Sequence, residues 1–167
     1  MVIIYFEPSA LFKAYIPEKG SLNVEFALSL LGRDILGATS LWSLLEIVWG
    51  FVKRRNLGEI TDEELEDIIE FFISDMEKME AEGKMKLIEV RREILSDAIE
   101  LVRQYNLYAA DALHIKTAEA INARIILVDD YHFGRIKGAT KLRTLSVESE
   151  EREFKETLRN MAKPVKI

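Results

Sequence analysis

The chain has 167 residues, of which 49% are hydrophobic and 31% are charged, with only 8 Gly and 3 Pro, so the composition indicates one helix-rich folded protein and excludes a disordered one. There is no Cys, which excludes disulfides, thiolate metal sites and cysteine nucleophiles. The net charge is -6, but residues 59–82 carry 11 of the 29 acids and one base, so the remainder, with 18 acids and 22 bases, is about +4 and can approach a polyanion.

Strands and helices alternate along the predicted chain. In order, the patterns predict a strand at 2–6, helices at 8–15 and 22–31, a strand at 35–38, helices from Thr39 or Ser40 to about Arg55 and from Thr61 to Gly83, a strand at 85–90, helices at 94–105 and 108–121, strands at 125–128 and 142–147, and a helix at 150–161. Helical units between strands favour an α/β fold with a mainly parallel sheet.

Cap and turn residues fix several of these boundaries. Thr61 and Glu64 form a capping box, and Ile60 and Leu65 are spaced for the hydrophobic staple that accompanies it. Asn122 suits the left-handed turn that ends the helix before the strand at 125–128. The start of the acidic helix and the end of the alanine-rich helix are therefore predicted from local chemistry alone.

Carboxylates follow two of the predicted strands. The strand at 125–128, Ile-Ile-Leu-Val, is apolar on both faces, as in a parallel sheet covered by helices on each side. Asp129 and Asp130 come directly after it, and Glu7 directly follows the strand at 2–6. Ligands of open α/β sheets bind outside the carboxyl ends of the strands. These acids are therefore predicted to lie at the functional edge of the sheet.

Glu46 stands out in the helix that ends near Arg55. That helix is apolar nearly all round, and only one narrow stripe, containing Ser43, Glu46 and Gly50, is small or polar. Burying a bare carboxylate is costly, so Glu46 must face water, a cation or a partner.

Glu7, Glu46, Asp111 and either Asp129 or Asp130 are thus predicted to converge. Like charges cannot gather unless something positive lies among them. Ligand sets made only of oxygen select hard cations such as Mg²⁺ or Mn²⁺, which favour phosphate substrates. The chemistry indicated is metal-assisted hydrolysis of a phosphodiester.

Several of these residues also have a purely structural interpretation. Asp111 suits the N-terminal dipole of a helix, and Asp129 and Asp130 suit a turn. His114 and His132 are interpreted as packing or phosphate-contacting residues. No Ser-His-Asp set and no glycine-rich phosphate loop is found.

Four motifs together carry a family resemblance. They are, in order, IIYFEPSALFKAYIPEKGS, SLWSLLEIVWGFVKRR, ADALHIKTA and ILVDDYHF. The chain resembles PIN domains, specifically the VapC-type toxins of prokaryotic toxin-antitoxin systems, from Met1 to about Val147. We therefore predict a PIN-like domain at 1–147, with a three-layer α/β/α fold, and a C-terminal helical tail at 148–167.

The resemblance implies a divalent-metal-dependent ribonuclease that cleaves RNA phosphodiesters with Mg²⁺ or Mn²⁺. It also implies a homodimer and an antitoxin protein whose segment occupies the active-site groove. The family's metal-binding and catalytic acids fall on Glu7, Glu46, Asp111 and Asp130, with Ser9 near the site, and we add Asp129 and His114 as supporting residues.

Two departures from the family pattern affect the expected activity. Glu7 stands where the family has Asp and is followed by Pro8, and Val128 stands where a Thr or Ser hydroxyl is usual. We therefore expect a weak ribonuclease, better supported by Mn²⁺ than by Mg²⁺. The alternative is a PIN-like module that binds RNA or protein without catalysis.

The start of the chain lacks a basic leader, and no apolar run reaches membrane-spanning length, so we expect a soluble cytoplasmic protein. The tail helix has one apolar side, and it is followed by Lys163 and Lys166. We expect that side, together with exposed aromatics near Trp42 and Trp49, to help form a dimer interface.

Overall fold

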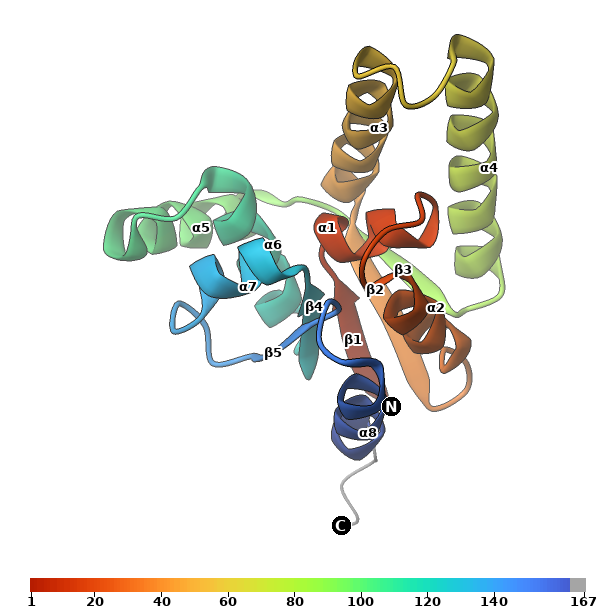
Figure 1. The fold of residues 1–167 in the computed structure, drawn as a ribbon. Helices are drawn as coiled ribbons and strands as arrows, with labels where there is room; N and C mark the ends of the chain where they lie inside the picture. The colour runs from red at the N-terminus through yellow and green to blue at the C-terminus, as the bar shows by residue number, and fades with distance from the viewer. Residues whose placement is uncertain (163–167) are drawn as a thin grey trace.

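The structure, a computed structural model, describes residues 1–162, so Lys163 and Lys166 at the predicted basic end lie outside it. A five-stranded sheet forms its centre (Figure 1). The strands are β1 (Val2–Phe6), β2 (Ile35–Ser40), β3 (Met85–Ile88), β4 (Ile125–Val128) and β5 (Arg143–Ser146), in the spatial order β3-β2-β1-β4-β5. Every neighbouring pair is parallel, which confirms the predicted parallel sheet.

Helices cover both faces of the sheet. They are α1 (Pro8–Leu11), the 3-10 turn η1 (Phe12–Ala14), α2 (Ser21–Ser29), α3 (Leu41–Asn56), α4 (Asp62–Ala81), α5 (Arg92–Tyr105), α6 (Ala109–Ala120), α7 (Asp130–Ile136) and α8 (Glu151–Ala162). Helix α7 is absent from the sequence prediction, which joined β4 to β5 without a helix. No helix in this part of the chain is both long and apolar enough to cross a membrane.

The strands contribute side chains to two hydrophobic cores, one on each face of the sheet. Successive residues of β4 alternate between them: Ile125 and Leu127 pack with α1 to α4 and α8, while Ile126 and Val128 pack with α5 to α7. All four side chains are fully buried. This alternation in a strand without polar residues confirms the three-layer α/β/α prediction.

The local signals for helix ends hold in the structure. The Thr61 hydroxyl accepts a hydrogen bond from the Glu64 N–H (3.1 Å), and the Glu64 carboxylate accepts one from the Thr61 N–H (2.7 Å), so the capping box is formed. Gly83 and Asn122 have φ of +69° and +54°, so both take the left-handed conformation expected at these positions.

Helix α3 differs from the prediction in how its surface is used. Ser43 is buried and accepts a hydrogen bond from the Thr39 hydroxyl (2.7 Å), so the first residue of the small or polar stripe does not face solvent. Gly50 lies against Phe12, whose ring would be 2.7 Å from an added Cβ. Trp42 and Trp49 are 45% and 59% exposed, which leaves part of this apolar helix open to solvent.

The apolar side of α8 is already covered by the rest of the chain. Phe154, Leu158 and Met161 belong to the core that contains α1 to α4. The Asn23 side chain on α2 donates hydrogen bonds to backbone carbonyls on either side of the loop before α8, at Val147 (2.8 Å) and Ser149 (2.9 Å). The prediction that this side of the tail contributes to a dimer interface is therefore wrong.

Candidate active site

The central strand β1 and its neighbour β4 end beside each other. The backbone N–H of Glu7 donates to the carbonyl of Leu127 (3.0 Å), so the residues after the two strands meet at one edge of the sheet. Glu7 follows β1, and Asp129 follows β4. This is the carboxyl edge at which ligands of parallel sheets bind.

Glu7 is buried and held by Ser9. Its Oε2 accepts a hydrogen bond from the Ser9 N–H (2.9 Å) and another from the Ser9 hydroxyl, so the side chain caps α1. The Ser9 hydroxyl oxygen also accepts from the Asp129 N–H (3.1 Å). Burial raises the pKa of Glu7, although the imidazoles of His114 and His132 oppose the shift.

Asp111 lies in the first turn of α6 and is also buried. Its Oδ2 forms an ion pair with Arg135 Nε at 3.1 Å, but outside hydrogen-bonding geometry, so this buried oxygen accepts no hydrogen bond. Its Oδ1 lies 3.7 Å from His132 Nε2. Burial raises the pKa of Asp111 despite the positive charges of His132 and Arg135.

His132 stands between the carboxylates. Its Nδ1 lies 2.7 Å from Asp129 Oδ1, the same oxygen that accepts a hydrogen bond from the His132 N–H (2.7 Å). Burial alone would lower the pKa of His132, but the bond with Asp129 and the charges of Glu7 and Asp111 outweigh it and raise the pKa to about 9. At neutral pH this imidazole is therefore a cation.

Glu46 is linked to the core through His114. Glu46 Oε2 lies 2.6 Å from His114 Nε2, and His114 Nδ1 lies 2.8 Å from the Tyr5 hydroxyl. Burial raises the pKa of Tyr5, so the hydroxyl stays protonated and donates to Nδ1. His114 then donates from Nε2 to Glu46, and it acts as a positioning residue for this carboxylate.

Asp130 points elsewhere. Its Oδ2 pairs with Lys19 Nζ (3.1 Å) and its Oδ1 accepts a hydrogen bond from the Ser146 hydroxyl. Those contacts lower the pKa of Asp130, whose side chain is 54% exposed. The structure thus brings Glu7, Asp111 and Asp129 around His132, and it directs the adjacent Asp130 to the rim.

Asp111, Asp129 and Asp130 are paired with cationic side chains of the protein. Within residues 1–162, no three His, Asp or Glu side chains lie close enough together to hold one metal ion as they stand. His132 and Arg135, both on the unpredicted helix α7, supply positive charge where the sequence predicted a metal. The one sequence signal for that helix was Asp129 itself, because Asp is a residue type that favours the N-cap of a helix.

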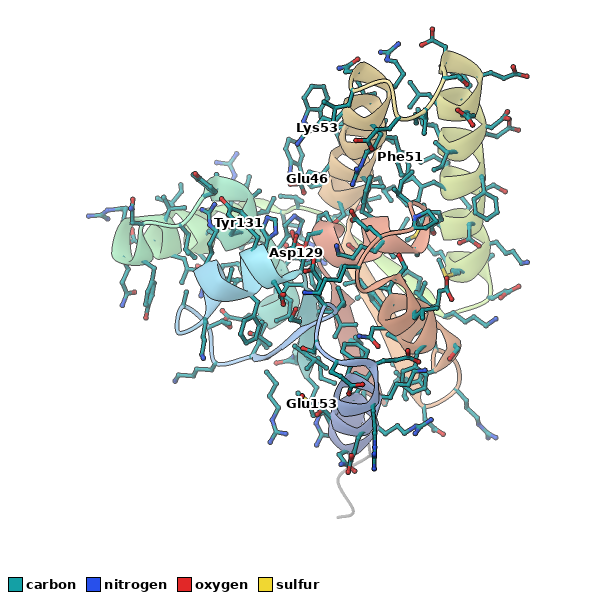
Figure 2. All side chains as sticks on the ribbon, viewed as in Figure 1. Glu46, Phe51, Lys53, Asp129, Tyr131 and Glu153 are labelled. Carbon is teal, nitrogen blue, oxygen red and sulfur yellow. The ribbon has the colours of Figure 1, made fainter. Side chains whose placement is uncertain are left out.

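A groove of about 440 Å³ runs from this site along α3. Glu7, Glu46 and His132 line one end, and basic and apolar residues of α3 line the other. Figure 2 shows Glu46 and Lys53 on the side of α3 that faces Asp129 and Tyr131, while Phe51 points toward α4. The groove therefore joins an acidic centre to a basic wall.

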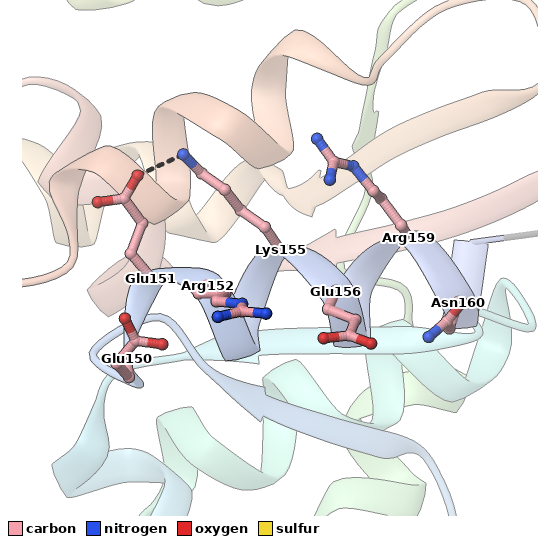
Figure 3. Close-up of a pocket in the computed structure, with 7 residues that line it drawn as sticks. All are labelled: Glu150, Glu151, Arg152, Lys155, Glu156, Arg159 and Asn160. Atoms are coloured by element: carbon pink, nitrogen blue, oxygen red, sulfur yellow. Dashed lines mark hydrogen bonds and ion pairs between the residues drawn. The ribbon is translucent and has the colours of Figure 1, made fainter.

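A second hollow lies along α8 (Figure 3). All its lining residues come from 150–160, and they carry three acidic and three basic groups, Glu150, Glu151, Glu156, Arg152, Lys155 and Arg159. Its charges are balanced and come from one segment, so it offers no selective site.

The sequence matches the PIN domain family over residues 4–139, and the chain belongs to that family. PIN domains are in general nucleases. No curated protein matches the chain in sequence.

Solved structures of low sequence identity share the fold. VapBC2 from Rickettsia felis, bound to a DNA fragment from its promoter, is 17% identical, with a TM-score of 0.60 over 87% of this chain and 98% of that one. PAE2754 from Pyrobaculum aerophilum is 15% identical, with a TM-score of 0.63 over 92% and 95%. A toxin-antitoxin complex from Klebsiella pneumoniae is 14% identical, with a TM-score of 0.56 over 86% and 97%.

Proposed function

We propose that this protein is a divalent-metal-dependent endoribonuclease of the toxin-antitoxin type, acting in the cytoplasm. The observation that carries the proposal is a pair of buried carboxylates, Glu7 and Asp111, whose pKa values are raised by burial at the carboxyl edge of a PIN-fold sheet. Perturbed carboxylates in a cleft are typical of functional sites.

The residues fit a hard divalent cation. All the candidate ligands are carboxylate oxygens, and Asp111 Oδ2 is buried without a hydrogen bond. Mg²⁺ is commonly held by one or two carboxylates together with substrate phosphates, so a compact cage of three is not needed. We propose Glu7 and Asp111 as the principal ligands, with Glu46 and Asp130 as the further acids and Asp129 in support. A bound ion would activate water and stabilise the leaving oxygen.

The protein's own groups have distinct roles in this proposal. Ser9 fixes the Glu7 carboxylate and the turn after β4 at once. His132 and Arg135 compensate the negative charge of the buried acids. Lys53 and Arg54 line the groove beyond the acids, where they would contact the backbone of an RNA strand.

The competing function is a binding module without catalysis. Val128 is fully buried in the core and offers no hydroxyl at the corner after β4. The Ser9 hydroxyl makes the hydrogen bond to the Asp129 N–H, so the corner still has a hydroxyl partner. This contact favours the enzyme over the degenerate module.

The direct test is cleavage of a single-stranded RNA by the purified protein. We expect slow cleavage with Mn²⁺, slower cleavage with Mg²⁺, and none with a chelator, because Mg²⁺ demands near-ideal octahedral geometry. RNA that is bound but left intact with both metals would instead support the binding module.

We expect Glu7→Asp to raise the rate of RNA cleavage by about tenfold, since an ångström of misplacement at a reacting centre can cost about a hundredfold. The shorter side chain also suits the cap of α1 that Glu7 now forms. The rate should be measured under single-turnover conditions with Mn²⁺. Glu25→Asp, on an exposed part of α2, is the control. A slower Glu7→Asp enzyme would mean that the backbone near Pro8 is adapted to glutamate.

An antitoxin partner is supported by similarity to toxin-antitoxin complexes. The groove along α3 would accept a segment of that partner, since Phe12, Trp49 and Leu57 offer apolar contacts beside Lys53 and Arg54. A small DNA-binding antitoxin encoded immediately upstream of this chain would support this role.

A homodimer is proposed through the apolar surface between α3 and α5. A groove of about 750 Å³ there is lined mainly by apolar side chains, and Trp42, Leu95 and Ile99 remain exposed around it. Exposed apolar surfaces of this kind typically mark association sites.

We expect Ile99→Lys to weaken dimerisation at least about tenfold, because it introduces a charge into a contact that is mainly apolar. Sedimentation at micromolar concentrations measures the change. Leu22→Lys, on exposed α2, is a control of the same chemistry. A wild-type protein that sediments as a monomer would contradict the dimer.

A further inference from the structure

Two exposed tyrosines flank the candidate site on the side opposite α3. Tyr108 directly precedes α6, and Tyr131 lies in the first turn of α7. They are 64% and 60% exposed. We call Tyr108, Tyr131 and Arg135 the tyrosine platform.

Arg135 fixes both rings. Its Cζ lies 3.2 Å from the centre of the Tyr108 ring and 5.4 Å from that of Tyr131. Its guanidinium donates a hydrogen bond to the Tyr131 hydroxyl (3.0 Å). The Arg135 side chain is only 19% exposed, so it is held in place rather than freely solvated.

The platform is in direct contact with Asp111 and His132 of the candidate site. The same guanidinium pairs with Asp111 through Nε (3.1 Å), and the Tyr131 ring packs edge-on against the imidazole of His132, with ring centres 5.1 Å apart. A group bound on the platform therefore lies next to the proposed reacting phosphodiester.

We propose that the tyrosine platform stacks an unpaired base of the RNA strand beside the scissile phosphodiester. The inference rests on the proposed ribonuclease function and adds a surface on the protein that holds one base of the RNA strand. Unpaired bases stack on aromatic rings and on guanidinium planes, and duplexes hide the faces of their bases. The guanidinium of Arg135 covers part of the Tyr108 ring, but both tyrosines keep most of their surface open, at 64% and 60% exposure.

The arrangement favours a base over an extended peptide. Arg135 already has its carboxylate partner in Asp111, so it offers little to an acidic peptide. The two rings offer apolar contact area and have few rotatable bonds. The hydroxyl of Tyr131 already accepts a hydrogen bond from Arg135. What remains open is ring surface, which every base can use.

The test measures affinity for a fluorescent single-stranded RNA of about 12 nucleotides, within the range covered by one single-strand site. A chelator is present, so binding is read without cleavage. We expect Tyr131→Ala to weaken binding about tenfold, and Tyr131→Phe to bind as the wild type does, since it keeps the ring and loses only the hydroxyl. The affinity for a duplex of the same sequence should not be changed by Tyr131→Ala.

Tyr105→Ala is the matched control, because Tyr105 is 43% exposed but lines a different groove with Gln104 and Lys116. Wild-type affinity in Tyr131→Ala would overturn the platform and leave the ribonuclease proposal standing, with a protein contact as the remaining use of these rings. An equal loss in Tyr131→Phe would also overturn it, since the effect would then act through Arg135. The wild type could also bind RNA without ever cleaving it. If Tyr131→Ala then lost RNA affinity, the platform would be supported and the nuclease proposal rejected.

Discussion

Asp111→Asn is expected to reduce RNA cleavage at least about a hundredfold. A metal centre stabilises the charge of the transition state by several kcal/mol, and part of this stabilisation is lost with an anionic ligand. Each increase of about 1.4 kcal/mol in the activation free energy slows the reaction tenfold. The amide keeps the size of the side chain, so the effect is electrostatic. Single-turnover cleavage with Mn²⁺ measures it, and Asp97→Asn, an exposed acid on α5, is the control.

The same variant should lose Mn²⁺ binding in a calorimetric titration, and the metal-free variant should unfold at the same temperature as the wild type or higher. Burial raises the pKa of Asp111, so the wild type loses stability as pH rises through that raised value and the carboxyl ionises. The amide does not ionise, so the variant has no such loss. A clear drop in unfolding temperature would instead favour the interpretation in which Asp111 serves the dipole of α6.

Much of the fold follows from local chemistry that the sequence displays. The capping box at Thr61 and the left-handed residue at Asn122 act within one turn of the chain, so their neighbours in space are also neighbours in sequence. The uniformly apolar β4 could be placed inside the sheet because no half-exposed strand tolerates four such residues. Because Glu7, Asp129 and Asp130 directly follow predicted strands, their place at the carboxyl edge of the sheet could also be predicted.

The choice between Asp129 and Asp130 could not be made from sequence, because both follow the same strand. The start of α7 decides it. Asp129 caps that helix, so its side chain turns back to the His132 N–H. Asp130 is the first helical residue and points toward Lys19 and Ser146. A helix of seven residues interrupted by Gly134 has too little periodicity to be recognised.

The contacts of Arg135 and α8 depend on tertiary packing. Arg135 lies 24 positions from Asp111 in the sequence, and only the packing of α7 against α6 brings them together. The apolar side of α8 was visible from spacing alone, but spacing does not say whether such a side meets another molecule or its own core. Phe154 and Leu158 meet the core.

His132 should make the stability of the metal-free protein depend on pH above neutrality. Its pKa is raised from 6.5 to about 9 in the folded state, so its contribution is fully present below about 6.5 and is lost as pH rises through about 9. Because a tenfold change in proton affinity corresponds to about 1.4 kcal/mol, the free energy of unfolding should fall by on the order of 2 kcal/mol between pH 7 and 9. Denaturant titrations in a chelating buffer measure this slope.

Two variants separate His132 from other groups that titrate in this range. His132→Gln should flatten the decline, because the amide carries no proton to lose. Asp129→Asn should reduce the decline while keeping the imidazole, because it removes the partner that does most to raise the pKa. If the wild type and His132→Gln show the same slope between pH 7 and 9, the cation among the buried acids must be Arg135, whose charge does not change there.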